Sequence, residues 1–264
     1  MALALLEREG DLIQQAKLYN NLGIAAYFAG DWDTALGHYE RCRDLGRRAG
    51  DLVLEATVGS NIGEILSDRG ELDEAIRLFE ASREAFEAAK YSIGIALTVG
   101  NLGRARLRAG DVAEARRLLE EARRQFESIH AGSFVAETLV RLAECAVTAG
   151  DPAEALVLVE QADQRLRTTP DSFVAVGAVR VRAEALLAAG HLTEAIGAAD
   201  RAVELARQSG ATFEHARSLD ARAAGARALA AAAARDGEEA AKLLTDLGVR
   251  HPPPPWGRRR ARRH

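Results

Sequence analysis

The sequence has few cysteines, prolines and aromatic residues, and these shortages exclude several classes of protein. Its two cysteines, Cys42 and Cys145, are too few for a disulfide framework, and both stand at small-residue positions of expected helices, where we expect them to be buried. Aromatic residues make up 5% of the chain. There is no secretory signal pattern, and no apolar run approaches the ~18 residues that a membrane span needs. We therefore expect a cytoplasmic protein without a membrane span.

The motifs of nucleotide-binding and hydrolytic enzymes are also missing. The sequence has no G-x-x-x-x-G-K-[S/T] phosphate loop, no G-x-G-x-x-G, no H-E-x-x-H, no C-x-x-C and no G-x-S-x-G. Its six histidines are isolated at expected turns, exposed helix faces or the C-terminal tail, where they do not form a metal-binding group. We expect no enzymatic activity, no cofactor and no metal site.

What the sequence does contain is one unit repeated every 40 residues, marked by glycine at positions 30, 70, 110, 150 and 190. Each glycine can adopt the left-handed conformation that ends a helix. The Asp-x-x-Glu pairs that follow, Asp111 with Glu114 and Asp151 with Glu154, are typical of a capping box that begins the next helix. The pattern predicts a helix end followed by a helix start in each unit.

A second set of positions alternates small and large residues. Small residues recur where two helices must approach closely, and large residues such as Tyr39 and Phe79 recur where the gap is filled. The structural repeat positions are Gly23, Gly63 and Gly103; Ala35, Ala75, Ala115, Ala155 and Ala195; and the turn glycines Gly30, Gly70, Gly110, Gly150 and Gly190.

In chain order, the units show a leucine-glycine pair, a glycine-aspartate pair, an alanine, and an aromatic residue followed by a small one. This pattern resembles the tetratricopeptide repeat (TPR) over residues 11–209. The resemblance implies an all-α fold, a right-handed TPR-like solenoid of antiparallel helix pairs. The usual TPR unit has about 34 residues, so a 40-residue unit makes each helix roughly one turn longer. First helices are expected near 12–29, 52–69, 92–109, 133–149 and 172–189, and second helices near 32–49, 72–89, 112–129, 152–167 and 192–208.

Three segments flank these five repeats. A shift of 40 residues lays Gly10 on Gly50, so residues 1–10 resemble the second half of a truncated repeat, which predicts that the chain is part of a longer protein. Residues 210–249 predict a degenerate repeat of capping helices, a long one near 212–235 and a short one near 238–247, with a turn at 236–238.

The last segment, residues 250–264, holds four prolines and six arginines and predicts a disordered Pro/Arg-rich tail. Its arginines have two interpretations: a cluster that binds phosphate groups, or a terminus that keeps the chain in solution. The second interpretation is favoured, because the rest of the chain has no basic face interleaved with aromatic residues. Nucleic acid is therefore not an expected partner.

The residue pattern of the repeats, as in residues 19–23 and 60–68, resembles that of the C-terminal TPR region of bacterial ATPase-containing signalling proteins. In those proteins the ATPase is joined to an adenylate/guanylate cyclase or to a helix-turn-helix transcriptional regulator. The resemblance implies a regulatory segment in signal transduction, with upstream domains of the parent protein as a partner. The alternative is a self-standing receptor for a short signalling peptide, and the coding sequence upstream of Met1 discriminates between the two.

In the TPR family the first helices line a concave groove that binds a protein or an extended peptide, and the resemblance assigns the groove candidates here. The main candidates are Asn20, Asn21, Tyr27, Asn61, Glu64, Asn101, Arg104 and Arg108. Further candidates are Lys17, Phe28, Asp68, Glu144, Arg180 and Glu184.

Asn21, Asn61 and Asn101 occupy one position in three successive units. In several TPR proteins an asparagine here grips the backbone of a bound peptide, since a carboxamide both donates and accepts. The other interpretation is that these side chains satisfy neighbouring polar groups between helices, and the sequence leaves both open. The family's carboxylate clamp is absent, because Asn20 and Ile24 stand where it needs lysine and asparagine.

Overall fold

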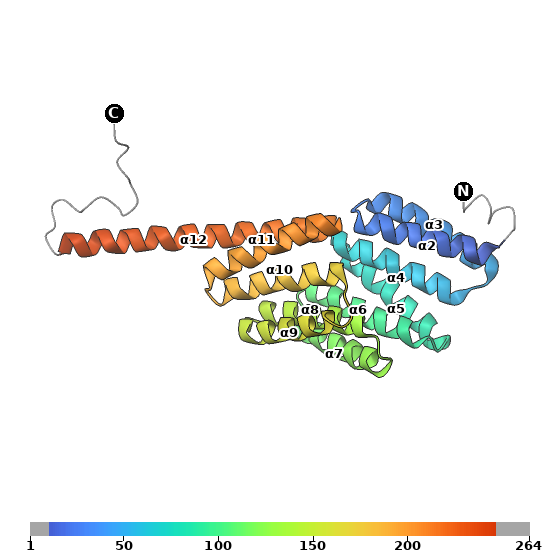
Figure 1. Cartoon of the computed structure of the whole chain (residues 1–264). Coiled ribbons are helices and arrows are strands. Elements are labelled where there is room, and N and C mark those ends of the chain that lie inside the picture. Colours follow the sequence, from blue (N-terminus) through green and yellow to red (C-terminus); the bar gives the residue numbers. More distant parts are fainter. Residues whose placement is uncertain (1–10, 247–264) are drawn as a thin grey trace, which may run out of the picture.

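The computed structural model of the chain describes residues 11–246, which form eleven α-helices and no strand (Figure 1). The helices are α2 (Leu12–Phe28), α3 (Trp32–Ala49), α4 (Leu52–Arg69), α5 (Leu72–Ala88), α6 (Ser92–Arg108), α7 (Val112–Ser128), α8 (Gly132–Thr148), α9 (Pro152–Leu166), α10 (Ser172–Ala188), α11 (Leu192–Ser209) and α12 (Thr212–Asp246). The first ten of these agree with the sequence-based helices to within one residue at either end.

The helices pack as consecutive pairs that stack into a solenoid. α2 packs on α3, α4 on α5, α6 on α7, α8 on α9 and α10 on α11, and each pair also contacts the next. The first helices α4, α6, α8 and α10 additionally contact one another along one side of the stack. The prediction of an all-α, TPR-like solenoid is therefore confirmed. No helix within residues 11–246 is both long and apolar enough to cross a bilayer.

The repeated turn has the geometry that its residues predict. The glycines at its start have positive φ, from +79° at Gly30 to +86° at Gly110. The carboxylate of Asp111 accepts a 3.2 Å hydrogen bond from the Glu114 backbone N–H, as the first half of a capping box does. The second half is not formed, because the Asp111 backbone N–H donates to the carbonyl oxygen of Arg106 in the preceding helix.

The alternation of small and large residues is confirmed as close contact within each helix pair. A Cβ atom placed on Gly63 would lie 2.7 Å from the Phe79 ring, and one on Gly23 would lie 2.4 Å from the Tyr39 ring. Both aromatic rings are buried against the glycine of the facing helix. The absence of a side chain therefore sets the distance between the two helices of a pair.

Both cysteines are buried free thiols, as expected. Burial raises the pKa of Cys42 to about 11 and that of Cys145 to about 12. Neither thiol is ionised at neutral pH, which agrees with a packing role.

The C-terminal capping region differs from the sequence-based expectation. Instead of a long and a short helix separated at 236–238, α12 is one continuous helix of 35 residues that runs beyond the repeats (Figure 1). A single glycine costs a helix only about 1 kcal/mol relative to alanine, and here it is flanked by long runs of good helix formers. The expected half-repeat at 1–10 and the tail at 250–264 lie outside the described residues.

The solenoid curls until its two ends meet, which the sequence did not predict. The side chain of Phe28 in α2 stacks on Phe173 in α10, with ring centroids 4.0 Å apart. Trp32 at the start of α3 meets Phe213 in α12 edge to face at 5.4 Å. Figure 1 shows α2 and α3 beside the junction of α11 and α12. The first helices therefore face a space that is closed on several sides.

Candidate binding cavity

The curl of the solenoid surrounds a cavity of about 340 Å³. Its walls are contributed by α2, α4, α6, α8 and α10, with further residues from α3, the turn before α10 and the start of α12. One part of the wall is apolar and aromatic, formed by Ile24, Tyr27, Phe28, Leu97, Phe134, Val140, Phe173 and Val174. The other part is polar and charged, formed by Asn61, Glu64, Asn101, Arg104, Glu137, Arg141, Asp171 and Glu214.

The aromatic wall comes from the contact that closes the solenoid. Phe28 lies between Phe173, on which it stacks at 4.0 Å, and Tyr27, which it meets edge to face at 5.3 Å. Phe134 on the opposite helix stacks on Phe126 at 5.1 Å. These rings give the cavity a rigid apolar surface with little side-chain freedom to lose on binding.

Tyr27 is fixed at the edge of the cavity by a cluster of buried charges. Its hydroxyl donates a 2.6 Å hydrogen bond to Oδ2 of Asp68, and Oδ1 of Asp68 lies 2.5 Å from Nη2 of Arg108. Burial, together with Asp68 and Glu64 and against the effect of Arg104, raises the pKa of Tyr27 far above its usual value. Burial would also raise the pKa of Asp68, but Arg104 and Arg108 outweigh it and hold that pKa low. Tyr27 is therefore a neutral hydrogen-bond donor.

Two of the three equivalent asparagines bond to the neighbouring first helix. Nδ2 of Asn61 donates to Oδ1 of Asn20 at 2.8 Å, and Nδ2 of Asn101 donates to Oε1 of Glu64 at 2.7 Å. Asn21 is exposed. The amide nitrogens of Asn61 and Asn101 thus tie helices together, while both residues still line the cavity. Their contact with a bound peptide stays a proposal.

Arg104 is the most unusual side chain of the wall. It is only 6% exposed, yet Nε and Nη2 are buried without a hydrogen-bond partner. The nearest ion pair joins Nη2 to Oε2 of Glu64 at 3.9 Å, which is too long for a hydrogen bond. Burial would lower the pKa of Arg104, but Asp68, Tyr27, Glu64 and Glu137 raise it, so the guanidinium stays charged.

A second group of buried charges lies between α8, α10 and α12. Arg180 is fully buried and donates to Glu214 and Glu184, both at 2.8 Å, and to Glu144. Arg217 reaches the same Glu144 oxygen at 3.0 Å. Each charge has a partner, so the sequence-based candidates Glu144, Arg180 and Glu184 are bonded to one another and to α12. These contacts fix the start of α12, including Glu214, against the cavity.

The remaining sequence-based candidates have mixed positions. Lys17 is exposed on α2 and does not line the cavity. Arg108 also donates to Ser67 at 2.8 Å and lies over the ring of Phe213 at 5.8 Å. Burial and Arg104 lower its pKa to about 10, against the effect of Asp68.

The sequence analysis missed several wall residues, among them Phe134, Glu137, Arg141 and Phe173. One signal was available: Arg141 stands 40 residues after Asn101, so it is the fourth member of the asparagine position. The two phenylalanines stand where the preceding unit has Gly94 or Ser133, and no repeat pattern marks them. Within residues 11–246 there is no group of three or more His, Cys, Asp or Glu side chains that could hold a metal ion.

Comparison with known families decides the identity of the repeats. The family model of the tetratricopeptide repeat matches residues 14–88, 53–128 and 94–166, which together cover more than half of the chain. The chain belongs to the tetratricopeptide repeat family. Comparison of this TPR protein with curated protein sequences found no match.

Solved structures share the TPR fold at low sequence identity. A Rap protein complexed with Competence and Sporulation Factor is 16% identical with a TM-score of 0.61, over 84% of this chain and 67% of that one. The Rap conjugation gene regulator of plasmid pLS20, in complex with the Phr* peptide, is 18% identical with a TM-score of 0.59, over 89% of this chain and 66% of that one. A putative kinesin light chain from Podosopora anserina is 18% identical with a TM-score of 0.51, over 73% and 95%. This TPR chain spans about two thirds of the two Rap proteins.

Proposed function

We propose that this chain is a non-catalytic scaffold that binds a protein, or an extended peptide segment, at the cavity of its first helices. The observation that carries this proposal is a cavity of about 340 Å³ whose wall draws on every first helix of the repeats. Its size falls within the range of roughly 300–1,000 Å³ that ligand pockets have. An apolar wall with a few fixed polar groups is also typical of such pockets.

The comparisons support a peptide as the ligand. Two Rap proteins of similar fold are described in complexes, one with Competence and Sporulation Factor and one with the Phr* peptide. Concave surfaces of solenoids are extended binding surfaces in general. The likeness in sequence is low, so the ligand of this chain is inferred from its own cavity and not from those complexes.

The residue pattern of the repeats supports a role for this chain as the regulatory segment of a larger bacterial signalling protein in the cytoplasm. The neighbouring domains in that protein are a cyclase-ATPase or a transcriptional regulator. Upstream domains of that parent protein are then a second partner. The closed solenoid supports the alternative of a self-standing receptor for a short signalling peptide. Phe28 and Phe173 close the cavity within one chain, so a peptide can be held without a further domain.

The proposal is tested by filling the cavity. Gly177 lines it, and a Cβ atom there would make only an ordinary 3.5 Å contact with Val140. We expect Gly177→Phe to fill the cavity, whereas Gly37→Phe, at an open position of α3 with no atom within 4 Å, leaves it unchanged. The chain is incubated with a pool of random hexapeptides, and retained peptides are identified by mass spectrometry after gel filtration.

The wild-type chain and Gly37→Phe should retain the same subset of peptides, and Gly177→Phe should lose it. The proposal fails if the wild-type chain retains no peptide, or if Gly177→Phe retains the wild-type subset. Thermal melts of both variants show whether each is folded.

A further inference from the structure

Arg104 is a buried cation, and part of its hydrogen-bonding capacity is unused within the part of the chain that the structure describes. Two of its nitrogens, Nε and Nη2, are buried without a partner, and the closest carboxylate, that of Glu64, stops at 3.9 Å. An unpaired buried donor costs more than an unpaired exposed one, and the cost is greatest for charged groups. Arg180 and Arg141, by contrast, donate hydrogen bonds to carboxylates. Two donor nitrogens of Arg104 therefore have no acceptor among residues 11–246.

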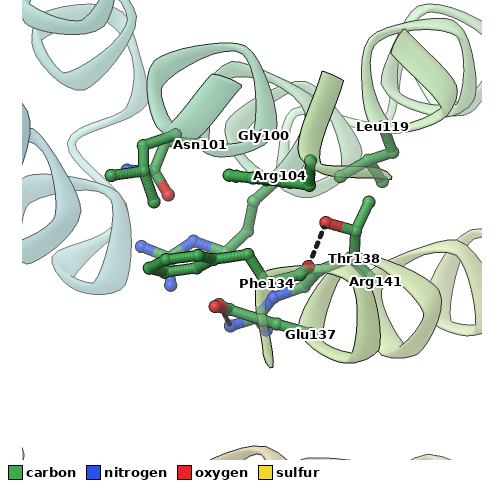
Figure 2. A pocket seen from close by; sticks show the side chains of 10 residues that line it. Gly100, Asn101, Arg104, Leu119, Phe134, Glu137, Thr138 and Arg141 are labelled. Atoms are coloured by element: carbon green, nitrogen blue, oxygen red, sulfur yellow. Dashed lines mark hydrogen bonds and ion pairs between the residues drawn. The ribbon is translucent and has the colours of Figure 1, made fainter. Parts of the chain in front are cut away.

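The position of Arg104 allows such an acceptor to come from a ligand. Its side chain lines the large cavity and also a hollow of about 30 Å³ between α6 and α8, where Asn101, Phe134, Glu137 and Arg141 gather around it (Figure 2). A hollow of this size exceeds the roughly 10–15 Å³ that one water molecule needs. The hollow shares Asn101, Arg104, Phe134, Glu137 and Arg141 with the wall of the large cavity, so the two spaces adjoin at Arg104.

The two unpaired nitrogens indicate which group this is. Nε and Nη2 lie on the same side of the guanidinium, so their N–H bonds run parallel and match the two oxygens of a carboxylate. The surrounding charges argue against a doubly charged group such as phosphate. Glu64, Asp68 and Glu137 carry three negative charges beside the three positive charges of Arg104, Arg108 and Arg141, so the group as a whole has no surplus of positive charge for a dianion.

We infer that the cavity binds its ligand by a carboxylate that pairs with Nε and Nη2 of Arg104. An apolar side chain beside that carboxylate then packs against Phe28, Phe134 and Phe173. The inference rests on the proposed peptide-binding function and specifies the recognised group. The carboxylate belongs either to the C-terminus of the peptide or to an aspartate or glutamate side chain, and the two sources are separated by experiment.

Three pools of random hexapeptides serve as probes for the full chain. The first has free C-termini and lacks Asp and Glu, the second has amidated C-termini and contains Asp and Glu, and the third has amidated C-termini and lacks both acids. We expect retention from a pool that carries carboxylates and none from the third pool. Retention from the first pool identifies the C-terminus, and retention from the second identifies an acidic side chain.

Three variants then test Arg104 itself. Arg104→Lys keeps the charge but removes the parallel donors, and should weaken binding of a retained peptide about tenfold. Arg104→Gln also removes the charge and should weaken binding further. Arg106→Gln is the matched control, because Arg106 lies on the same helix, is more exposed and forms only a 3.8 Å ion pair with Glu80. It should bind peptide like the wild-type chain.

The outcomes separate this inference from the proposed function. If the third pool is retained like the others, or if a folded Arg104→Lys binds with wild-type affinity, the carboxylate inference is wrong while peptide binding stands. If no pool is retained, the proposed function is wrong and the inference falls with it. Arg104→Lys decides the matter even if Arg104→Gln does not fold, since lysine still balances the surrounding acids.

Discussion

The side-chain hydroxyl of Thr212 donates a 2.9 Å hydrogen bond to the carbonyl oxygen of Ala29, 183 residues earlier in the chain. The bond joins the first turn of α12 to the end of α2, where a helix leaves its last carbonyls without partners of its own. It lies beside Gly30, where a Cβ atom would come within 2.9 Å of Thr212. Such contacts convert a groove that is open in an ordinary solenoid into a partly enclosed cavity.

This closure can be tested by Phe28→Ala. The substitution removes the 4.0 Å stack on Phe173, so we expect unfolding free energy to fall, with about 0.5–1.5 kcal/mol from the aromatic pair alone. The radius of gyration from small-angle X-ray scattering should rise as the ends separate. Leu52→Ala, at a side chain 67% exposed, is the control and should change neither quantity. An unchanged radius of gyration in Phe28→Ala would show that the aromatic pair does not hold the ends together.

The packing of helix pairs predicts opposite effects for one substitution at two glycines. Gly63→Ala places a Cβ atom 2.7 Å from the fully buried ring of Phe79, and overpacking of this kind costs about 1–3 kcal/mol. Gly63→Leu and Ala75→Leu should be worse. Gly37→Ala meets no atom within 4 Å in α3 and should stabilise by about 0.4–1 kcal/mol. Equal melting temperatures for Gly63→Ala and Gly37→Ala would contradict the assigned contact.

The asparagines should differ in their effect on stability. Asn101→Ala removes the 2.7 Å bond to Glu64, so we expect a loss of about 1 kcal/mol in chemical denaturation. Asn21→Ala alters an exposed side chain and should leave stability unchanged. The opposite pattern, with Asn101→Ala neutral in stability but weak in peptide binding, would assign the asparagine to the ligand alone.

The buried Glu144 predicts a pH dependence of stability. Burial would raise its pKa, but Arg217, Arg180 and Arg141 outweigh burial and hold the pKa well below the usual 4.5. Its contribution is therefore fully present above about pH 4.5 and is lost as the pH falls through the lower folded-state pKa. Glu144→Gln should cost about 3–5 kcal/mol at pH 7, because it breaks a buried ion pair.

Below pH 4.5 the difference between Glu144→Gln and the wild-type chain should shrink, as measured by urea unfolding at several pH values. Glu71→Gln is the control, since Glu71 is exposed and its side chain makes no capping bond to α5. A difference that stays constant from pH 7 to pH 3 would show that the charge of Glu144 is not what stabilises the cluster.

The chain should show no turnover of ATP and no synthesis of cyclic nucleotides, because its sequence has no phosphate loop of the kind that cradles nucleotides. Coupled assays of phosphate release and of cyclic nucleotide formation check this. Turnover abolished by a single substitution within the chain would overturn the non-catalytic assignment.

The helices and their pairing were predictable because their causes are local. The turn glycines and the aspartate caps act within a few residues, and Gly63 meets Phe79 within a single repeat. The exception is α12, which continues through Gly237 because one glycine is too weak a helix breaker to end a helix flanked by good helix formers. The candidate site was predicted in part: Tyr27, Glu64 and Arg104 do line the cavity, but Phe134 and Phe173 were missed because they break the repeat pattern.

The sequence by itself determined the repeat length, the helix boundaries, the close helix pairs and the face that the first helices present. Only the tertiary structure decided that Phe28 reaches Phe173 and that Thr212 reaches Ala29. The curvature of a solenoid is the sum of small rotations between successive repeats. No local pattern encodes that sum, so the partly enclosed cavity and the unpaired nitrogens of Arg104 depend on how all the repeats stack.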